Sequence, residues 1–368
     1  MGEMSQEPLE PQTKTWLQRD VLFFADHGHL FDQLLETVSQ QRYATFLVLY
    51  AEIVQMLTES PDRDSFSRDA LRIMALSAQE RHAWVGDPAF QIWIGLAFKA
   101  TNALLRNLTQ DQGELIQLLQ GFPALLQRIE ARQSDSNTQS QPPIRRFEID
   151  PLIALATPPS YEFPIEASKT QLERTGYSLA FFTDVATLAL QRIAQTWPAC
   201  HARFGQLVQL ICYLPDGGFR SCSASRYTGV ILIAAKDQSI LDVEESLVHE
   251  WAHQLLYHIV EICPIIDDEG PEASFKLPWS SQERDLYGYF HAFFVYVFLV
   301  KYLERVQQRA HNEQLCAQRR MAFILDGLKK ALPDLLASQG FTPMGKTLLA
   351  CLEQELRALD INHAAHPG

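Results

Sequence analysis

The stretch Ser246-Leu-Val-His-Glu-Trp-Ala-His-Gln-Leu-Leu256 decides how the rest of this chain is interpreted. Its apolar residues, with no proline or glycine among them, predict a buried helix. Because an α-helix places residues four apart on one face, His249 and His253 can bind the same divalent metal ion. Glu250 is their neighbour, where a carboxylate can act as a base or hold a metal-bound water. The pattern predicts a metal site; a core helix with hydrogen-bonded histidines is the alternative.

Two histidines hold a metal ion weakly, so a third ligand is needed. The longer motif H-E-x-x-H-x-x-G-x-x-H supplies its third histidine from the same segment, but here Leu256 stands at its Gly position and Ile259 at its last His position. His291 lies instead in the most apolar stretch of the chain, next to Phe290, and we predict it as the third ligand. Three neutral imidazoles suit Zn²⁺ and Fe²⁺ equally, so the ligands alone leave the metal open.

The composition is that of a globular protein that can bury a large core. The chain has 368 residues, 47% of them hydrophobic, which allows one large or two moderate domains. A formal net charge of -13 without a basic stripe argues against nucleic acid as a partner. The longest apolar run, from Phe290 to Val300, is too short to span a bilayer, so no membrane is expected as a partner either.

The cysteines and the N-terminus indicate a cytoplasmic location. The six cysteines are irregularly spaced and form no C-x-x-C pair, which is typical of reduced thiols in a cytosolic protein. Residues Met1 to Gln12 are polar and acidic, unlike a signal peptide.

We expect a mainly α (α+β) fold in three parts. Residues 1–131 read as a helical N-terminal region, 132–144 as a linker or mobile loop, and 145–368 as the H-E-x-x-H metal-binding catalytic domain. Two β-leaning segments, 207–214 and 229–235, precede the metal-binding helix. A small sheet leading into such a helix is the arrangement of zincin-type folds, and this likeness is an analogy.

A second block of sequence carries a family resemblance. It reads Pro278-Trp-Ser-Ser-Gln-Glu-Arg-Asp-Leu-Tyr-Gly-Tyr-Phe-His291, and weaker similarities occur in Gly86-Asp-Pro-Ala-Phe-Gln-Ile-Trp93 and Phe341-Thr-Pro-Met-Gly345. Together with the H-E-x-x-H motif, these segments resemble the H-E-x-x-H-motif peptide-modification proteins found with ribosomally made, post-translationally modified peptides. The resemblance covers about residues 80 to 355.

The resemblance implies a non-haem iron, 2-oxoglutarate-dependent dioxygenase of natural product biosynthesis. Such an enzyme uses O₂ to hydroxylate the β-carbon of a residue in a ribosomally synthesised precursor peptide, its partner. By the same resemblance, His249, His253 and His291 would bind Fe(II), with Glu250 beside them.

The resemblance also implies a cation for the distal carboxylate of 2-oxoglutarate. Arg284 is the first candidate, because a guanidinium binds a carboxylate in a bidentate manner. Arg226, with Ser223 and Ser225, is the second.

Two other functions remain open from the residues. The first is a zinc metallopeptidase, in which Glu250 would deprotonate a zinc-bound water. The second is a non-catalytic module whose helical first 130 residues bind a peptide or a protein.

Overall fold

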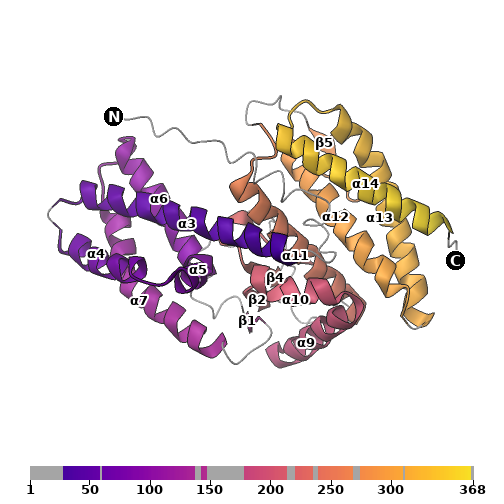
Figure 1. Cartoon of the computed structure of the whole chain (residues 1–368), viewed down its shortest axis with the longest axis horizontal. Helices are drawn as coiled ribbons and strands as arrows, with labels where there is room; N and C mark the ends of the chain where they lie inside the picture. Colours follow the sequence, from indigo (N-terminus) through magenta and orange to yellow (C-terminus); the bar gives the residue numbers. More distant parts are fainter. Residues whose placement is uncertain are drawn as a thin grey trace, which may run out of the picture. The chain divides into compact units, whose positions relative to one another are not determined.

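The computed structural model describes residues 28–58, 60–136, 142–146, 178–213, 220–234, 239–267, 274–309 and 311–365 (Figure 1). It is 76% helical with a few small sheets, which confirms the predicted mainly α (α+β) class. Contacts divide the chain into two units that interleave along the sequence. The first unit comprises residues 1–35, 187–203 and 240–368, and the second comprises 36–186 and 204–239.

Most of the second unit is helical. Its helices are most of α3 (Gly28–Met56), α4 (Pro61–Met74), α5 (Ala78–Gly86), α6 (Pro88–Leu105) and α7 (Gly113–Ser136). Two of these helices begin at residues suited to their positions. Ser77 and Glu80 form a reciprocal capping box at the start of α5, and Asp87 caps α6 ahead of Pro88.

An aromatic cluster forms the core of these helices. Phe66, Phe90, Trp93 and Phe122 are each buried, and the rings of Trp93 and Phe122 lie 4.4 Å apart between centroids. These residues come from α4, α6 and α7, so the cluster joins three helices of the second unit.

The segment predicted as a linker is more regular than expected. Helix α7 continues to Ser136, and strand β1 (Ile144–Arg146) begins where the linker was expected to end. The Arg132 side chain donates a hydrogen bond of 2.9 Å to the buried carboxylate of Asp87, which ties this part of α7 to the start of α6. Residues 137–141 lie outside the described part of the chain.

A four-stranded sheet completes the second unit. Its order is β1, β2 (Leu210–Tyr213), β4 (Val230–Ile233) and β3 (Ser221–Cys222), and only the β3–β4 pair is antiparallel. Every residue of β2 and β4 is buried, as the two predicted β-leaning segments require. Gly229, before β4, has a φ of 92°, and a Cβ there would lie 2.9 Å from Pro88. Only glycine satisfies both conditions.

The first unit contains the rest of the chain. Its elements are parts of α9 (Leu179–Thr196) and α10 (Pro198–Leu207), then α11 (Ile240–Ile262), β5 (Phe275–Lys276), β6 (Glu283–Arg284), α12 (Leu286–Val306), α13 (His311–Ala337) and α14 (Pro343–Ala365). Helix α12 packs against α11, α13 and α14. The last three helices of the chain, α12, α13 and α14, lie side by side in Figure 1. At the start of α14, Thr342 Oγ1 accepts a hydrogen bond of 3.0 Å from the Gly345 amide.

Helix α12 is the core helix of the first unit. It is long and apolar enough to cross a membrane by length and composition, but 72% of that window is buried inside the protein. Packing against three neighbouring helices therefore accounts for its composition, and the prediction of a buried helix here is confirmed.

Replacing Phe122 with alanine tests the aromatic core. The change removes a fully buried ring that packs on Trp93 and Phe66, and should lower the free energy of unfolding by about 3–5 kcal/mol. Urea unfolding of the Phe122→Ala variant measures this loss. The control is Leu108→Ala, which truncates an apolar side chain that is 76% exposed and should stay within about 0.5 kcal/mol of wild type. Equal effects of the two changes would contradict this account of the core.

Candidate metal centre

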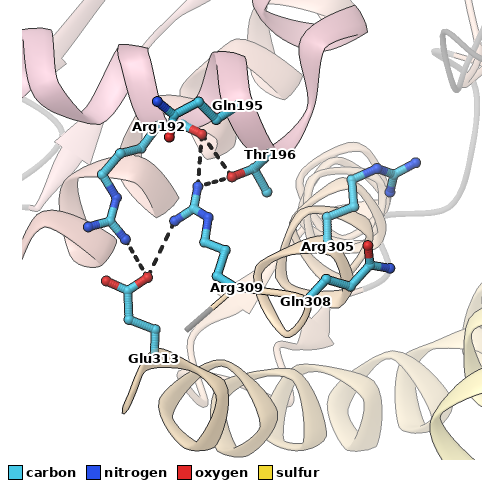
Figure 2. A pocket seen from close by; sticks show the side chains of 7 residues that line it. All are labelled: Arg192, Gln195, Thr196, Arg305, Gln308, Arg309 and Glu313. Carbon is cyan, nitrogen blue, oxygen red and sulfur yellow. Dashed lines mark hydrogen bonds and ion pairs between the residues drawn. The ribbon is translucent and has the colours of Figure 1, made fainter. Parts of the chain in front are cut away.

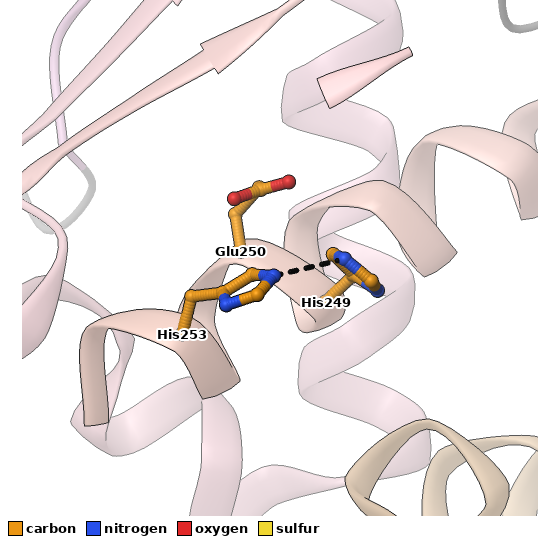
Figure 3. Close-up of side chains that lie close together, drawn as sticks. All are labelled: His249, Glu250 and His253. Carbon is orange, nitrogen blue, oxygen red and sulfur yellow. Dashed lines mark hydrogen bonds between the residues drawn. The ribbon is translucent and has the colours of Figure 1, made fainter. Parts of the chain in front are cut away.

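Helix α11 presents the predicted donors close together. His249 Nε2 and His253 Nε2 lie 3.0 Å apart, and one donor atom from each of His249, Glu250 and His253 lies within 4.8 Å of the others (Figure 3). Metal–nitrogen bonds of about 2.0–2.1 Å place two ligand nitrogens roughly 3 Å apart on one ion. The spacing of the two imidazoles therefore suits a shared divalent cation.

His291 from α12 reaches the same cluster from the other side of His253. Its Nε2 lies 2.5 Å from His253 Nδ1, and the two ring centroids are 4.4 Å apart. The two helices thus bring the three predicted histidines into one chain of contacts. His253 is the middle member: its Nε2 faces His249 and its Nδ1 faces His291.

Burial keeps the central imidazoles neutral. It lowers the pKa of His253 well below the usual value, and the neighbouring His291 and His249 lower it further. Burial, followed by the charge of His249, also lowers the pKa of His291 to about 3. Because only the unprotonated nitrogen of an imidazole binds a metal ion, both side chains are held in the metal-binding form at neutral pH.

A shell of aromatic residues surrounds the histidines. Tyr257 and Tyr287 contact His291, with ring centroids 5.1 and 5.4 Å away, and Tyr296 lies 5.8 Å from His249. The sequence analysis did not single out these tyrosines. Helical spacing could have found two of them, because Tyr257 follows His253 by four residues and Tyr287 precedes His291 by four.

Trp279 packs against one residue of this shell, Tyr296. Its ring packs on Tyr296 at 4.3 Å, and its indole N–H donates a hydrogen bond of 3.2 Å to the Ile324 carbonyl on α13. Gly327, one helical turn further along α13, makes room for the indole, because a Cβ at this position would lie 2.0 Å from Trp279 Nε1. Trp279 is therefore held by the Ile324 carbonyl, and it fits because Gly327 has no side chain.

Arg284, the first candidate for the cosubstrate carboxylate, is exposed on β6. Its guanidinium donates hydrogen bonds to the Gln282 side chain at 3.0 Å and to the Glu283 carbonyl at 3.4 Å. Among the described residues it forms no ion pair and has no recorded contact with the three histidines.

The second set of cosubstrate candidates belongs to the other unit. Arg226 is exposed in the short 3-10 helix η4 (Ser225–Tyr227), with its guanidinium over the Tyr227 ring at 5.4 Å. Ser225 is exposed as well, and its carbonyl accepts a hydrogen bond of 2.8 Å from the Thr228 hydroxyl. Ser223 is half-buried, and its carbonyl accepts from the Cys222 thiol.

No known protein family and no curated protein sequence matches this chain. Its function therefore has to be argued from the residues of the site, and the family resemblance stays a prediction.

The Gly327→Ala change tests how Trp279 is held. The new methyl group would overlap the indole and should destabilise the protein by about 1–3 kcal/mol while altering the tryptophan environment. Thermal unfolding and near-ultraviolet circular dichroism report the two effects. In the control variant, Gly95→Ala, the new Cβ meets nothing within 4 Å on an exposed helix position, so stability should rise by about 0.5–1 kcal/mol. A Gly327→Ala variant with unchanged stability and spectrum would refute the close contact.

Proposed function

We propose that this protein is an Fe(II)- and 2-oxoglutarate-dependent oxygenase that hydroxylates the β-carbon of a residue in a ribosomally synthesised precursor peptide. The observation that carries the proposal is the convergence of His249, His253 and Glu250 on α11, with His291 of α12 against them. When bound, Fe(II) with 2-oxoglutarate would activate O₂, the oxidant that a C–H hydroxylation needs and that protein side chains cannot activate.

The donor set supports a non-haem iron site in two ways. Two imidazoles and one carboxylate within 4.8 Å are donor types that non-haem iron accepts, and the proposal keeps Glu250 beside the metal while the histidines bind it. His291 is the third imidazole of the proposed ligand set. In the present arrangement its Nε2 faces His253 Nδ1 and lies outside the donor group of His249, Glu250 and His253; there it can accept the Nδ1–H of His253, which fixes the tautomer that binds a metal through Nε2. As a ligand, His291 Nε2 would have to give up this contact.

The surrounding residues would orient a peptide and exclude water. Tyr257, Tyr287 and Tyr296 contact the imidazoles in edge-type ring pairs and carry hydroxyls that can bond to a peptide backbone. Arg284 follows Trp279 by five residues and forms no ion pair with a described residue. We assign it to the distal carboxylate of 2-oxoglutarate, since its acidic neighbours Glu283 and Asp285 accept hydrogen bonds from Ser274 and from the Gly288 amide instead.

We place the protein in the cytoplasm as part of this proposal. All six cysteines are free thiols, and four of them are buried, which supports a reducing environment.

A zinc metallopeptidase is the second candidate, because Glu250 is only 1% exposed and belongs to the same donor group as both histidines of its helix. A carboxylate so placed can take a proton from a metal-bound water. The two candidates differ in the metal they require and in the product they release.

Removing the central histidine should abolish metal binding. The His253→Ala variant loses the imidazole that faces both other histidines, and we expect it to retain less than about one hundredth of the wild-type affinity for Fe(II). Anaerobic equilibration with Fe(II) followed by metal analysis measures this. His201→Ala removes a half-buried histidine of α10 outside the cluster and serves as the control. Wild-type metal content in His253→Ala would rule out the site.

The reaction is tested with iron-loaded and zinc-loaded protein. Iron-loaded protein should convert 2-oxoglutarate to succinate, and a co-expressed precursor peptide should gain one oxygen in tandem mass spectrometry. Arg284→Gln should raise the KM for 2-oxoglutarate about tenfold or more, whereas Arg319→Gln, a change at an exposed arginine of α13, should not. Peptide-bond cleavage by zinc-loaded protein that disappears in Glu250→Gln would establish the peptidase instead. The absence of both activities would leave a peptide-binding module.

A further inference from the structure

A second polar site lies in the first unit, where the end of α9, the end of α12 and the start of α13 meet. A pocket of about 510 Å³ opens there (Figure 2). Its lining is polar and rich in arginine: Arg192, Gln195, Thr196, Arg305, Gln308, Arg309 and Glu313. None of these residues belongs to the metal-binding group, so the pocket is separate from the function proposed above.

Two of the three arginines are neutralised by acids. The fully buried carboxylate of Glu244 on α11 lies 2.5 Å from Arg192 Nε and 2.7 Å from Arg309 Nη1. Glu313 pairs with both guanidiniums as well. Arg309 also donates hydrogen bonds to the Arg192 carbonyl, at 2.9 Å, and to the Thr196 hydroxyl. Two positive charges therefore meet two negative charges on this side of the pocket.

Arg305 is the arginine without an acidic partner. Its guanidinium lies over the Trp197 ring at 4.6 Å, and its Nη1 donates a hydrogen bond of 2.7 Å to the Lys301 carbonyl. It forms no ion pair with any residue in the described part of the chain. Burial lowers the pKa of Arg305, which shows the desolvation that this guanidinium experiences. The charges of Glu304 and Glu355 offset part of this cost without forming an ion pair with Arg305, and an anion in the pocket would offset more of it.

The pocket therefore has two unlike sides. Figure 2 shows Arg305, in the last turn of α12, and Gln308, just beyond the end of that helix, apart from the connected network of Arg192, Glu313, Arg309 and Thr196. The first side offers a guanidinium that forms no ion pair with a described residue, together with a neutral amide; the second offers a hydrogen-bonded network with balanced charge. A volume of about 510 Å³ is within the range of small-molecule sites.

We propose that this pocket binds a small molecule through one anionic oxygen group, a carboxylate or a phosphate, with Arg305 as the main contact. A guanidinium can bind either group through two parallel hydrogen bonds. Gln308 and Gln195 supply neutral donors and acceptors for the remainder of the ligand.

The test titrates the full chain with inorganic phosphate and, separately, with acetate, at ionic strength kept constant with chloride. Calorimetry should detect binding of at least one anion to the wild-type protein. Arg305→Gln should weaken that binding about tenfold or more, because a charge-assisted hydrogen-bond pair is lost. The anion that binds more tightly identifies the group of the natural ligand.

Three further variants make the result specific. Arg319→Gln removes an exposed arginine of α13 and should bind like the wild type. His253→Ala should also keep anion binding, so that failure of the metal centre and failure of this pocket are distinguishable. Should Arg305→Gln not fold, Arg305→Lys keeps the charge but loses the forked geometry, and should bind more weakly than Arg319→Gln. Equal binding by the Arg305 variants and Arg319→Gln, or no binding of either anion to the wild type, would overturn the proposal.

Discussion

The buried carboxylate of Glu244 is the interaction on which the first unit depends. It is fully buried on α11, yet it binds Arg192 of α9, Arg309 beyond the end of α12, and the hydroxyl of Tyr302 on α12. Removing one partner of such a buried pair typically costs about 3–5 kcal/mol, because the other charge is left without compensation. Three segments of the chain are therefore held in register around one side chain.

Helix α11 carries buried carboxylates at its beginning and histidines further along, and side chains of α12 contact both groups. At its beginning, Glu244 meets Tyr302, and Glu245 meets Arg320 of α13 at 3.2 Å. Further along, His253 meets His291. The contacts between these two helices thus join the buried Glu244 to Tyr302 and the candidate metal ligand His253 to His291. Any shift of α12 along α11 that broke the first set of contacts would also move the imidazole of residue 291 away from the metal-binding group.

Sequence patterns over short windows predicted the main helices and strands, whereas features that depend on contacts between distant segments could not be predicted from the sequence. The H-E-x-x-H helix, the buried helix around His291 and the strands at 207–214 and 229–235 follow from periodicity and composition over short windows. The interleaved units do not, because they arise from contacts between distant segments. The same reason hid the Glu244 network, whose arginines are 52 residues before it and 65 after it in the sequence. The need for glycine at position 327 likewise arises from its contact with Trp279, 48 residues earlier in the sequence.

The interleaving of the two units has a consequence for how the chain is made. Domains fold as units during synthesis, generally from the N-terminus, as the ribosome releases them. Here residues 187–203 belong with 240–368, so this part of the first unit emerges long before the helices it packs with. Arg192 must wait for Glu313, 121 residues later, before its ion pair can form. Until then Arg192 of α9 and Glu244 of α11 lack their later partners, and this unit can close around its buried charges only once α12 and the start of α13 have been released.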